Sequence, residues 1–179
     1  NNIQIHHTED YSIFEHFISI YNQTMQRDNA EEYYYFQEEF YKAIHDYLKG
    51  NYQVFYATLD DQIIAVSIIL YANKQIHYHL SGSLSEYRSF APTNLLLYEV
   101  ALWGHQQGYK KFHLGGGLGS GNDNLYKFKA AFNRKSGLQF SIGKQIFNQA
   151  LYNQLVEERL AEDPNFDLEG KYFPLYRAK

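Results

Sequence analysis

Three consecutive strand-like segments, joined by two very short turns, constrain the fold of this chain more than any other feature. Residues 52–59, 63–71 and 76–80 are rich in β-branched and aromatic side chains, as strands are. Asp60-Asp61 and Asn73-Lys74 separate them, and such residue pairs are typical of tight hairpin turns. Connections this short can join only antiparallel neighbours. The sequence therefore predicts a three-stranded antiparallel meander.

Amphipathic helices flank the meander on both sides along the chain. Apolar side chains recur at three- and four-residue intervals before it, which predicts helices over 11–26 and 33–48. After it, Pro92 opens the next predicted helix and Gly108 ends that helix. The other expected elements are a strand near 3–5, the helix over 93–107, a strand over 111–114, a helix over 125–132, a strand over 138–146 and a helix over 148–161.

This order of elements predicts an α/β (α+β) fold, in which a mixed, mostly antiparallel central sheet has helices on both faces. Neither a doubly wound parallel sheet nor a barrel has this order. The 179 residues contain no internal repeat, low-complexity run or linker, so we expect a single domain over residues 1–179.

The composition excludes several classes of function. A formal net charge of −4 is unsuited to gripping duplex DNA, although a local basic strip can receive a single-stranded end. The chain has no cysteine, so disulfides, thiolate metal sites and a cysteine nucleophile are excluded. No apolar run approaches the roughly 18 residues that suggest a membrane span, and the first residues lack the pattern of a signal peptide. We expect a cytoplasmic protein.

Five short strings stand in order along the chain: Tyr78-His79-Leu80-Ser81-Gly82, Ala91-Pro92-Thr93-Asn94-Leu95-Leu96, His113-Leu114-Gly115-Gly116-Gly117, Leu125-Tyr126-Lys127-Phe128-Lys129 and Tyr172-Phe173-Pro174-Leu175-Tyr176-Arg177. Each string alone has low specificity. Their order and spacing resemble the Fem-type (FemABX-like) aminoacyltransferases of the GNAT superfamily and their BioF2-like acetyltransferase relatives. The likeness covers roughly residues 10–177 and implies a GNAT-like fold.

The resemblance also implies an activity. Fem-type enzymes form an amide on an amine of a cell-wall precursor, and related proteins act on polysaccharide precursors. Ordinary GNAT enzymes hold acyl-CoA with a Q/R-x-x-G-x-G/A loop, which is missing from the corresponding residues 81–92. The likeness therefore favours aminoacyl-tRNA as the acyl donor, with no tightly bound cofactor. Acyl-CoA is the alternative cosubstrate.

Fem-type enzymes have two GNAT-like halves, and this chain has the length of one. It corresponds to the second half, which handles the donor. We expect it to act with an N-terminal half or as a homodimer that imitates the two halves. Two alternatives to the Fem-like function are a stand-alone acyl-CoA-dependent N-acetyltransferase and a catalytically silent binding module.

Lys129 is the first candidate for catalysis. The resemblance places Phe128 and Lys129 at the donor end of the cleft, with Tyr126 nearby. An ammonium there can stabilise the oxyanion that develops during acyl transfer, or hold the ribose-phosphate end of a charged tRNA. The structural alternative is a solvated lysine on a helix surface.

A glycine-rich loop precedes this helix. Residues 115–121 contain five glycines, among them Gly115, Gly116 and Gly117, but match neither the dinucleotide-binding nor the P-loop pattern. Backbone N–H groups of such a loop can bind a phosphate or an oxyanion. The structural alternative is a tight turn that needs positive φ angles.

Three histidines are candidates for proton transfer. His77 and His79 lie two residues apart on one predicted strand and therefore face the same way, and His113 lies on a later strand. His79 or His113 can act as a base, because imidazole titrates near neutrality. The alternative is a histidine hydrogen-bonded within the sheet. We expect no metal, because carboxylate partners for the three rings are not evident.

Arg88 and Asn94 lie where GNAT enzymes hold their donor, and an arginine suits contact with a phosphate or carboxylate. The alternatives are a surface salt bridge for Arg88 and a capping or packing role for Asn94. A concentration of basic residues, interleaved with aromatic ones, can receive the acceptor end of a tRNA. Its members are Lys110, Lys111, Lys127, Lys129, Arg134, Lys135 and Lys144.

Overall fold

The computed structural model describes residues 2–117, 121–135 and 137–178. The chain divides into two compact units, Asn1–Arg134 and Lys135–Lys179, and each is described by itself. The expectation of one domain over residues 1–179 remains a prediction.

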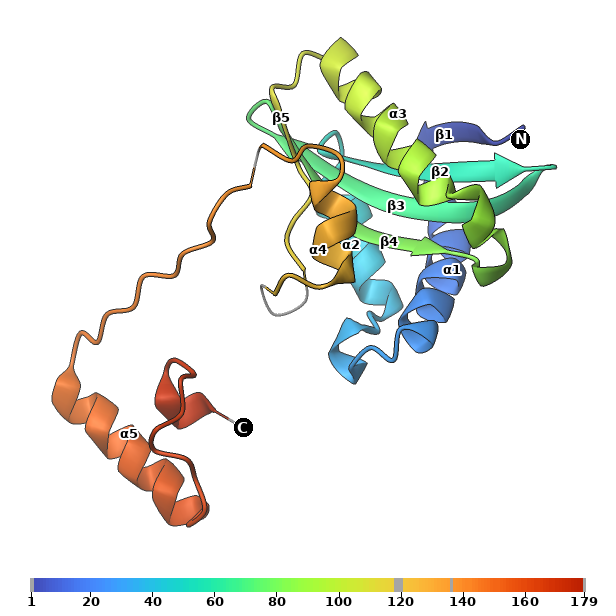
Figure 1. Cartoon of the computed structure of the whole chain (residues 1–179). Helices are drawn as coiled ribbons and strands as arrows, with labels where there is room; N and C mark the ends of the chain where they lie inside the picture. Colours follow the sequence, from blue (N-terminus) through green and yellow to red (C-terminus); the bar gives the residue numbers. More distant parts are fainter. Residues whose placement is uncertain (1, 118–120, 136, 179) are drawn as a thin grey trace. The chain divides into compact units, whose positions relative to one another are not determined.

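The first unit contains the sheet and most of the helices (Figure 1). Its strands are β1 (Gln4–Thr8), β2 (Tyr52–Leu59), β3 (Gln62–Ala72), β4 (Gln75–Ser83) and β5 (Lys111–His113). Its helices are α1 (Ile13–Arg27), α2 (Glu38–Tyr47), α3 (Pro92–Gln106) and α4 (Asn124–Ala130), with short 3-10 helices η1 (Glu32–Tyr34) and η2 (Ser85–Phe90).

The five strands form one sheet in the order β1-β2-β3-β4-β5. The first four pair antiparallel with their neighbours in sequence, and β5 pairs parallel to β4. The turn residues Asp60, Asp61, Asn73 and Lys74 all have positive φ, which matches the twist that two-residue hairpins require. The predicted meander and the mixed, mostly antiparallel sheet are therefore confirmed.

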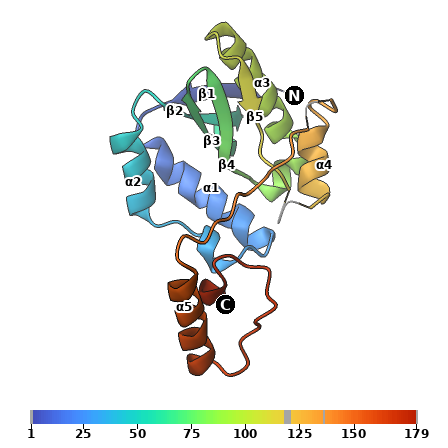
Figure 2. The ribbon, with the colours of Figure 1, turned by 90° about the vertical axis from the view of Figure 1, so that its left-hand side faces the viewer.

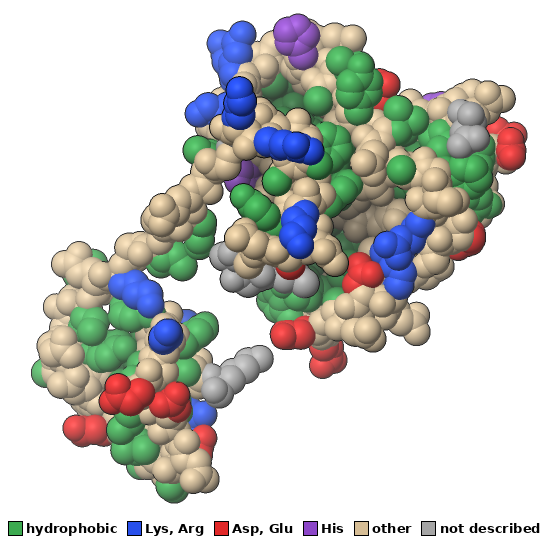
Figure 3. Space-filling model, in the orientation of Figure 1, with side chains coloured by type: hydrophobic (Ala, Val, Ile, Leu, Met, Phe, Trp, Pro, Cys, Tyr) green, Lys and Arg blue, Asp and Glu red, His purple; other side chains and the backbone are tan. Residues whose placement is uncertain are grey.

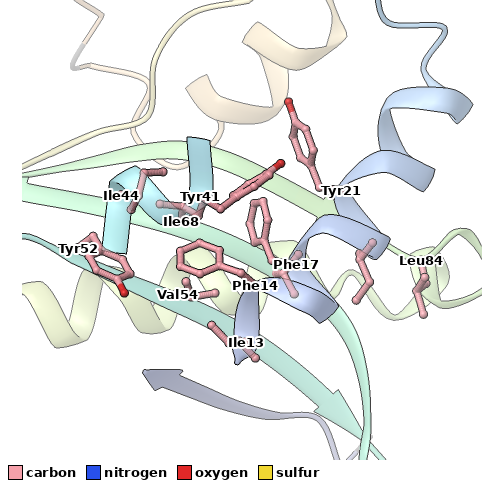
Figure 4. Close-up of a cluster of buried hydrophobic side chains, with 12 residues drawn as sticks. Ile13, Phe14, Phe17, Tyr21, Tyr41, Ile44, Tyr52, Val54, Ile68 and Leu84 are labelled. Carbon is pink, nitrogen blue, oxygen red and sulfur yellow. The ribbon is translucent and has the colours of Figure 1, made fainter. Parts of the chain in front are cut away.

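Helices cover both faces of this sheet. Figure 2 shows α1 and α2 on one side and α3 and α4 on the other. Figure 4 shows the core under α1 and α2, where aromatic side chains from both helices meet Tyr52, Val54 and Ile68 of the sheet. Under α3, the side chains of Leu96, Leu97 and Val100 pack against the opposite face. Tyr21, Tyr41 and Tyr52 are thus core residues, since each has a large apolar ring.

Close backbone contact fixes α1 against β4. A Cβ atom on Gly82 would lie 2.8 Å from the Cα atom of Tyr21 and 2.9 Å from the carbonyl oxygen of Ile20, so only glycine fits there. The Thr24 hydroxyl accepts a hydrogen bond from the Ser83 backbone N–H at 2.9 Å and donates to the Ile20 carbonyl at 2.9 Å. These contacts fix the position of the C-terminal end of β4 relative to α1.

Two predictions were wrong: the start of the second helix and the presence of a strand over 138–146. The helix expected over 33–48 begins only at Glu38, and the residues before it form the short η1 turn. Aromatic side chains such as those of Tyr33–Tyr35 lose rotamer freedom in a helix, whereas Glu38 and Glu39 favour a helix N-terminus. The strand expected over 138–146 has no regular structure, because its alternating apolar pattern meets no partner strand among the described residues.

The second unit contains helix α5 (Gln149–Glu162) and the short 3-10 helix η4 (Leu175–Arg177). The ring of Tyr152 stacks on that of Phe173 with 6.1 Å between centroids, and its hydroxyl accepts a hydrogen bond from the Leu175 N–H at 2.9 Å. The predicted helix over 148–161 is confirmed, because the bounds of α5 differ from it by one residue at each end. Of the helices in the described ranges, none has the length and hydrophobicity needed to cross a bilayer.

Candidate functional site

The candidate site lies where β4 and β5 stop pairing. The two strands pair over Gln75–His77 and Lys111–His113, and the described residues give no further pair beyond His77 and His113. One step later, Tyr78 pairs with Ile69 and Leu80 with Ile68 of β3, so His79 between them has no partner on β3. This bulge increases the local twist and changes the direction of the side chains that follow.

Lys129 reaches this point from α4. Its Nζ donates a hydrogen bond to the Gly116 carbonyl at 2.8 Å and lies 5.7 Å from the centroid of the Tyr78 ring. Burial lowers the pKa of the Lys129 ammonium, and the negative charge of Asp123 opposes that shift. Lys129 is therefore a partly buried cation fixed beside the parting strands, unlike a freely solvated surface lysine.

The glycine loop is shaped by this lysine and by the start of α4. Gly115 has a φ of +75°, and a Cβ there would lie 3.3 Å from Lys129 Nζ. A Cβ on Gly117 would lie 2.6 Å from the Gly121 carbonyl oxygen. The Asp123 side chain accepts a hydrogen bond from the Tyr126 N–H at 2.7 Å and caps α4. Residues 118–120 of the predicted loop lie outside the described residues.

The histidines lie together beside the same point. Nδ1 of His77 is 2.9 Å from Nδ1 of His113, and the two rings stack with centroids 5.1 Å apart. The His79 ring lies 5.9 Å from that of His77 and 6.3 Å from the Phe40 ring of α2. Burial lowers the pKa of His77 and of His79, and the neighbouring rings lower that of His77 further. Both rings are therefore neutral at pH 7 and can accept protons.

The other predicted site residues lie on η2, α3 and α4. Arg88 lies on η2, and Asn94 lies in the first turn of α3, with both side chains exposed. Tyr126 is 38% exposed on α4, and Phe128 packs with the α3 core cluster. Their roles remain predictions.

The predicted basic concentration is divided between the two units. Lys110, Lys111, Lys127, Lys129 and Arg134 belong to the first unit, and Lys135 and Lys144 belong to the second. Figure 3 shows basic side chains gathered over the part of the first unit that holds β5 and α4. Part of the positive charge of this unit is thus near the parting strands.

A cavity of about 520 Å³ opens next to the histidine pair. It is lined by Leu48, Asn51, Leu70, Tyr71, Ala72, Gln75, Ile76, His77 and His113. Local sequence pattern does not reveal it, because its walls come from the segment between α2 and β2, the β3–β4 hairpin and β5. A usable signal was the presence of histidine on both strands, but only the register His77↔His113 brings the two rings together.

No group of three or more His, Asp or Glu side chains suited to a metal ion occurs in the ranges that the structure describes. Although His77, His79 and His113 are neighbours, two of their ring nitrogens are engaged with each other.

The order of strands and helices, with a partly buried cation where the fourth and fifth strands part, is that of an acyltransferase fold. The family model described as the acetyltransferase (GNAT) domain matches residues 3–129. Since that match covers more than half of the chain, the protein belongs to the GNAT acetyltransferase family and is an acyltransferase. Comparison with curated proteins found no match.

Solved structures show the same fold at low sequence identity. An aminoglycoside acetyltransferase, meta-AAC0020, from an uncultured soil metagenomic sample in complex with sisomicin is 12% identical, with a TM-score of 0.60 over 82% of this chain and 97% of that one. FemX is 14% identical, with a TM-score of 0.59 over 73% of this chain and 48% of FemX. AAC(6')-Iy, in complex with a bisubstrate analogue of CoA and acetylneamine, is 12% identical, with a TM-score of 0.53 over 83% of this chain and 99% of that one.

The match to about half of FemX agrees with the Fem-type resemblance, which is confirmed at the level of fold. At these identities the likeness concerns the fold alone, and the substrates of those proteins are their own.

Proposed function

We propose that this protein transfers an acyl or aminoacyl group to an amine of a cell-wall or polysaccharide precursor, in the manner of the Fem-type enzymes. The observation that carries the proposal is Lys129, a partly buried ammonium fixed by Gly116 beside the parting strands. The oxygen of an acyl carbonyl bound between these strands would lie near a positive charge whose position is already fixed.

The chemistry requires little more than this charge and a base. As the amine nitrogen attacks the carbonyl carbon, negative charge develops on the carbonyl oxygen, and a preorganised cation in a partly desolvated site stabilises that charge. The nitrogen must also lose a proton. His79 and His113 lie near enough to the same point to be candidates for this base, because neutral imidazole accepts protons near pH 7.

The segment between β4 and α3 supports aminoacyl-tRNA as the donor. Residues 85–90 form the 3-10 helix η2, whose turn includes a hydrogen bond from the Ala91 N–H to the Arg88 carbonyl at 3.0 Å. That bond and the one from the Tyr87 N–H to the Leu84 carbonyl at 3.3 Å engage two backbone N–H groups, whereas a pyrophosphate-binding loop would leave such groups open to a ligand. The basic side chains near β5 and α4 would then contact the end of the nucleic acid.

Acyl-CoA is the second candidate donor, and one observation favours it. Arg88 is an exposed guanidinium on η2, next to the start of α3, where it can contact a phosphate. The complex of AAC(6')-Iy with a CoA bisubstrate analogue shows that a protein of similar fold holds CoA.

The test is a transfer assay with an amine acceptor and, in separate reactions, aminoacyl-tRNA or acetyl-CoA. Lys129→Ala should lower kcat/KM by about 10²–10³-fold, as loss of one oxyanion-stabilising group does. Lys42→Ala is the control, because Lys42 is an exposed lysine of the same unit that lies outside the basic concentration. Full activity of Lys129→Ala would show that the reacting carbonyl lies elsewhere.

The same assay separates the two donors. Saturable transfer from aminoacyl-tRNA, with none from acetyl-CoA, is the expected result. Transfer from acetyl-CoA that Arg88→Ala weakens several-fold would favour the second candidate.

A further inference from the structure

The open cavity beside the histidine pair can hold a small organic molecule. Its volume of about 520 Å³ lies within the roughly 300–1,000 Å³ of typical ligand sites, and five of its nine lining residues are exposed to solvent. Leu48, which directly follows α2, Leu70 of β3 and Ile76 of β4 give it aliphatic walls. Burial of aliphatic groups of a ligand against these side chains would stabilise a complex.

The polar side chains in this wall are those of Asn51, Tyr71, Gln75 and the two histidines, and none of them carries a fixed charge. Of the described residues that line the cavity, none is an Asp, Glu, Lys or Arg. A ligand with several positive charges would lose hydration there without gaining a counter-charge, which is unfavourable. The lining therefore fits a molecule whose body is uncharged and whose single polar group reaches the histidines.

The histidine pair can take up one proton and keep its hydrogen bond. Each neutral imidazole has one N–H and one free lone pair. The contact of 2.9 Å between Nδ1 of His77 and Nδ1 of His113 uses one N–H and one lone pair, which leaves one Nε2 lone pair free. A proton on that nitrogen keeps the pair intact with a charge-assisted bond, whereas a second proton would make both Nδ1 atoms donors and break it.

We propose that this cavity binds the acceptor of the reaction, a primary amine on an uncharged aliphatic chain, and that the His77–His113 pair takes the proton of that amine. The inference rests on the acyl transfer proposed above and names its acceptor class. The amine nitrogen forms a bond to the acyl carbon, and the C–O or C–S bond of the donor breaks. The proton lost by nitrogen goes to the free Nε2, and the pair returns one proton to the departing oxygen or sulfur.

The test uses the full chain and three probes without any donor: n-hexylamine, n-hexanol and spermidine. Binding is followed by the amide signals of the cavity residues and by the ring ¹⁵N signals of His77 and His113 in NMR spectra. Hexylamine should shift both sets of signals saturably, and hexanol and spermidine should bind at least about five-fold more weakly.

Leu48→Ala should weaken hexylamine binding at least about three-fold, since it removes part of the aliphatic wall. Leu102→Ala is the control, because Leu102 is 38% exposed against 36% for Leu48 but lies on α3, outside this cavity. Dispersed spectra of both variants would show that they fold. Equal binding of hexanol or spermidine, or equal affinity of Leu48→Ala and the parent protein, would overturn the proposal.

A transfer assay with hexylamine separates this proposal from the function on which it rests. If hexylamine binds as expected and neither donor acylates it, the cavity still recognises an amine and the acyl transfer fails. If hexylamide forms with a KM that Leu48→Ala leaves unchanged, the acyl transfer stands and the cavity is not the acceptor site.

Discussion

Tyr41 and Tyr52, two tyrosines in the same aromatic core, differ in what their hydroxyl groups contact. Both side chains are 0% exposed. The Tyr52 hydroxyl donates to the Glu9 carbonyl at 2.8 Å and is 2.9 Å from Nδ1 of His45. The buried Tyr41 hydroxyl has no hydrogen-bond partner among the residues that the structure describes. A buried polar atom without a partner keeps its desolvation penalty, whereas a bonded one offsets it.

The two Tyr→Phe variants should therefore differ in their effect on the free energy of unfolding. Tyr52→Phe should lower the free energy of unfolding by about 1–2 kcal/mol, because it leaves the Glu9 carbonyl without its partner. Tyr41→Phe should leave it unchanged or raise it by up to about 1 kcal/mol. Urea unfolding followed by circular dichroism measures both, and a larger loss for Tyr41→Phe would contradict the assignment.

At the scale of elements, the contact between α1 and β4 positions the strand that carries the histidines. Gly82 lies against the backbone of Tyr21 and Ile20, which cannot move aside as a flexible side chain can. Gly82→Ala should lower the free energy of unfolding by about 1–3 kcal/mol, as overpacking of a core does. Urea midpoints give the change. Gly143→Ala is the control, since a Cβ at Gly143 meets nothing within 4 Å, and an equal effect of both variants would rule out the packing explanation.

Two of the predicted strands also show where the local pattern of apolar residues is sufficient to predict a strand and where it is not. Residues 52–59 were predicted as a strand, and β2 has these bounds, because both its pattern and its turn agree with the sheet. Residues 138–146 have a similar apolar alternation, yet Leu138 and Phe140 are 87% and 74% exposed. Alternation describes which face a strand would bury, but pairing requires a neighbour that local sequence does not identify.

At the scale of the whole molecule, the partly buried side chains of His77 and His79 should make stability depend on pH. The folded-state pKa values of His77 and His79 are below the ordinary value of 6.5, so the unfolded chain binds protons first as the pH falls. Stability contributed by the neutral rings is fully present above about pH 6.5 and is lost as the pH falls through the folded pKa values.

Unfolding in urea at pH 7.5 and pH 5.5 checks this dependence. The midpoint of the parent protein should fall at the lower pH, and His77→Gln with His79→Gln should reduce the fall. An unchanged pH dependence in the double variant would show that other groups cause it.

The sequence by itself determined the order of elements up to residue 132, apart from the start of α2, and the meander with its two hairpin turns, because these follow from local periodicity and turn chemistry. The resemblance of its short strings indicated the GNAT-type fold class and Lys129, and imidazole chemistry indicated His79 and His113. Only the tertiary structure paired His77 with His113, placed Lys129 against Gly116 and formed the open cavity beside them. The reason is that strand register and helix packing bring together residues far apart in the chain, and local pattern contains no information on that distance.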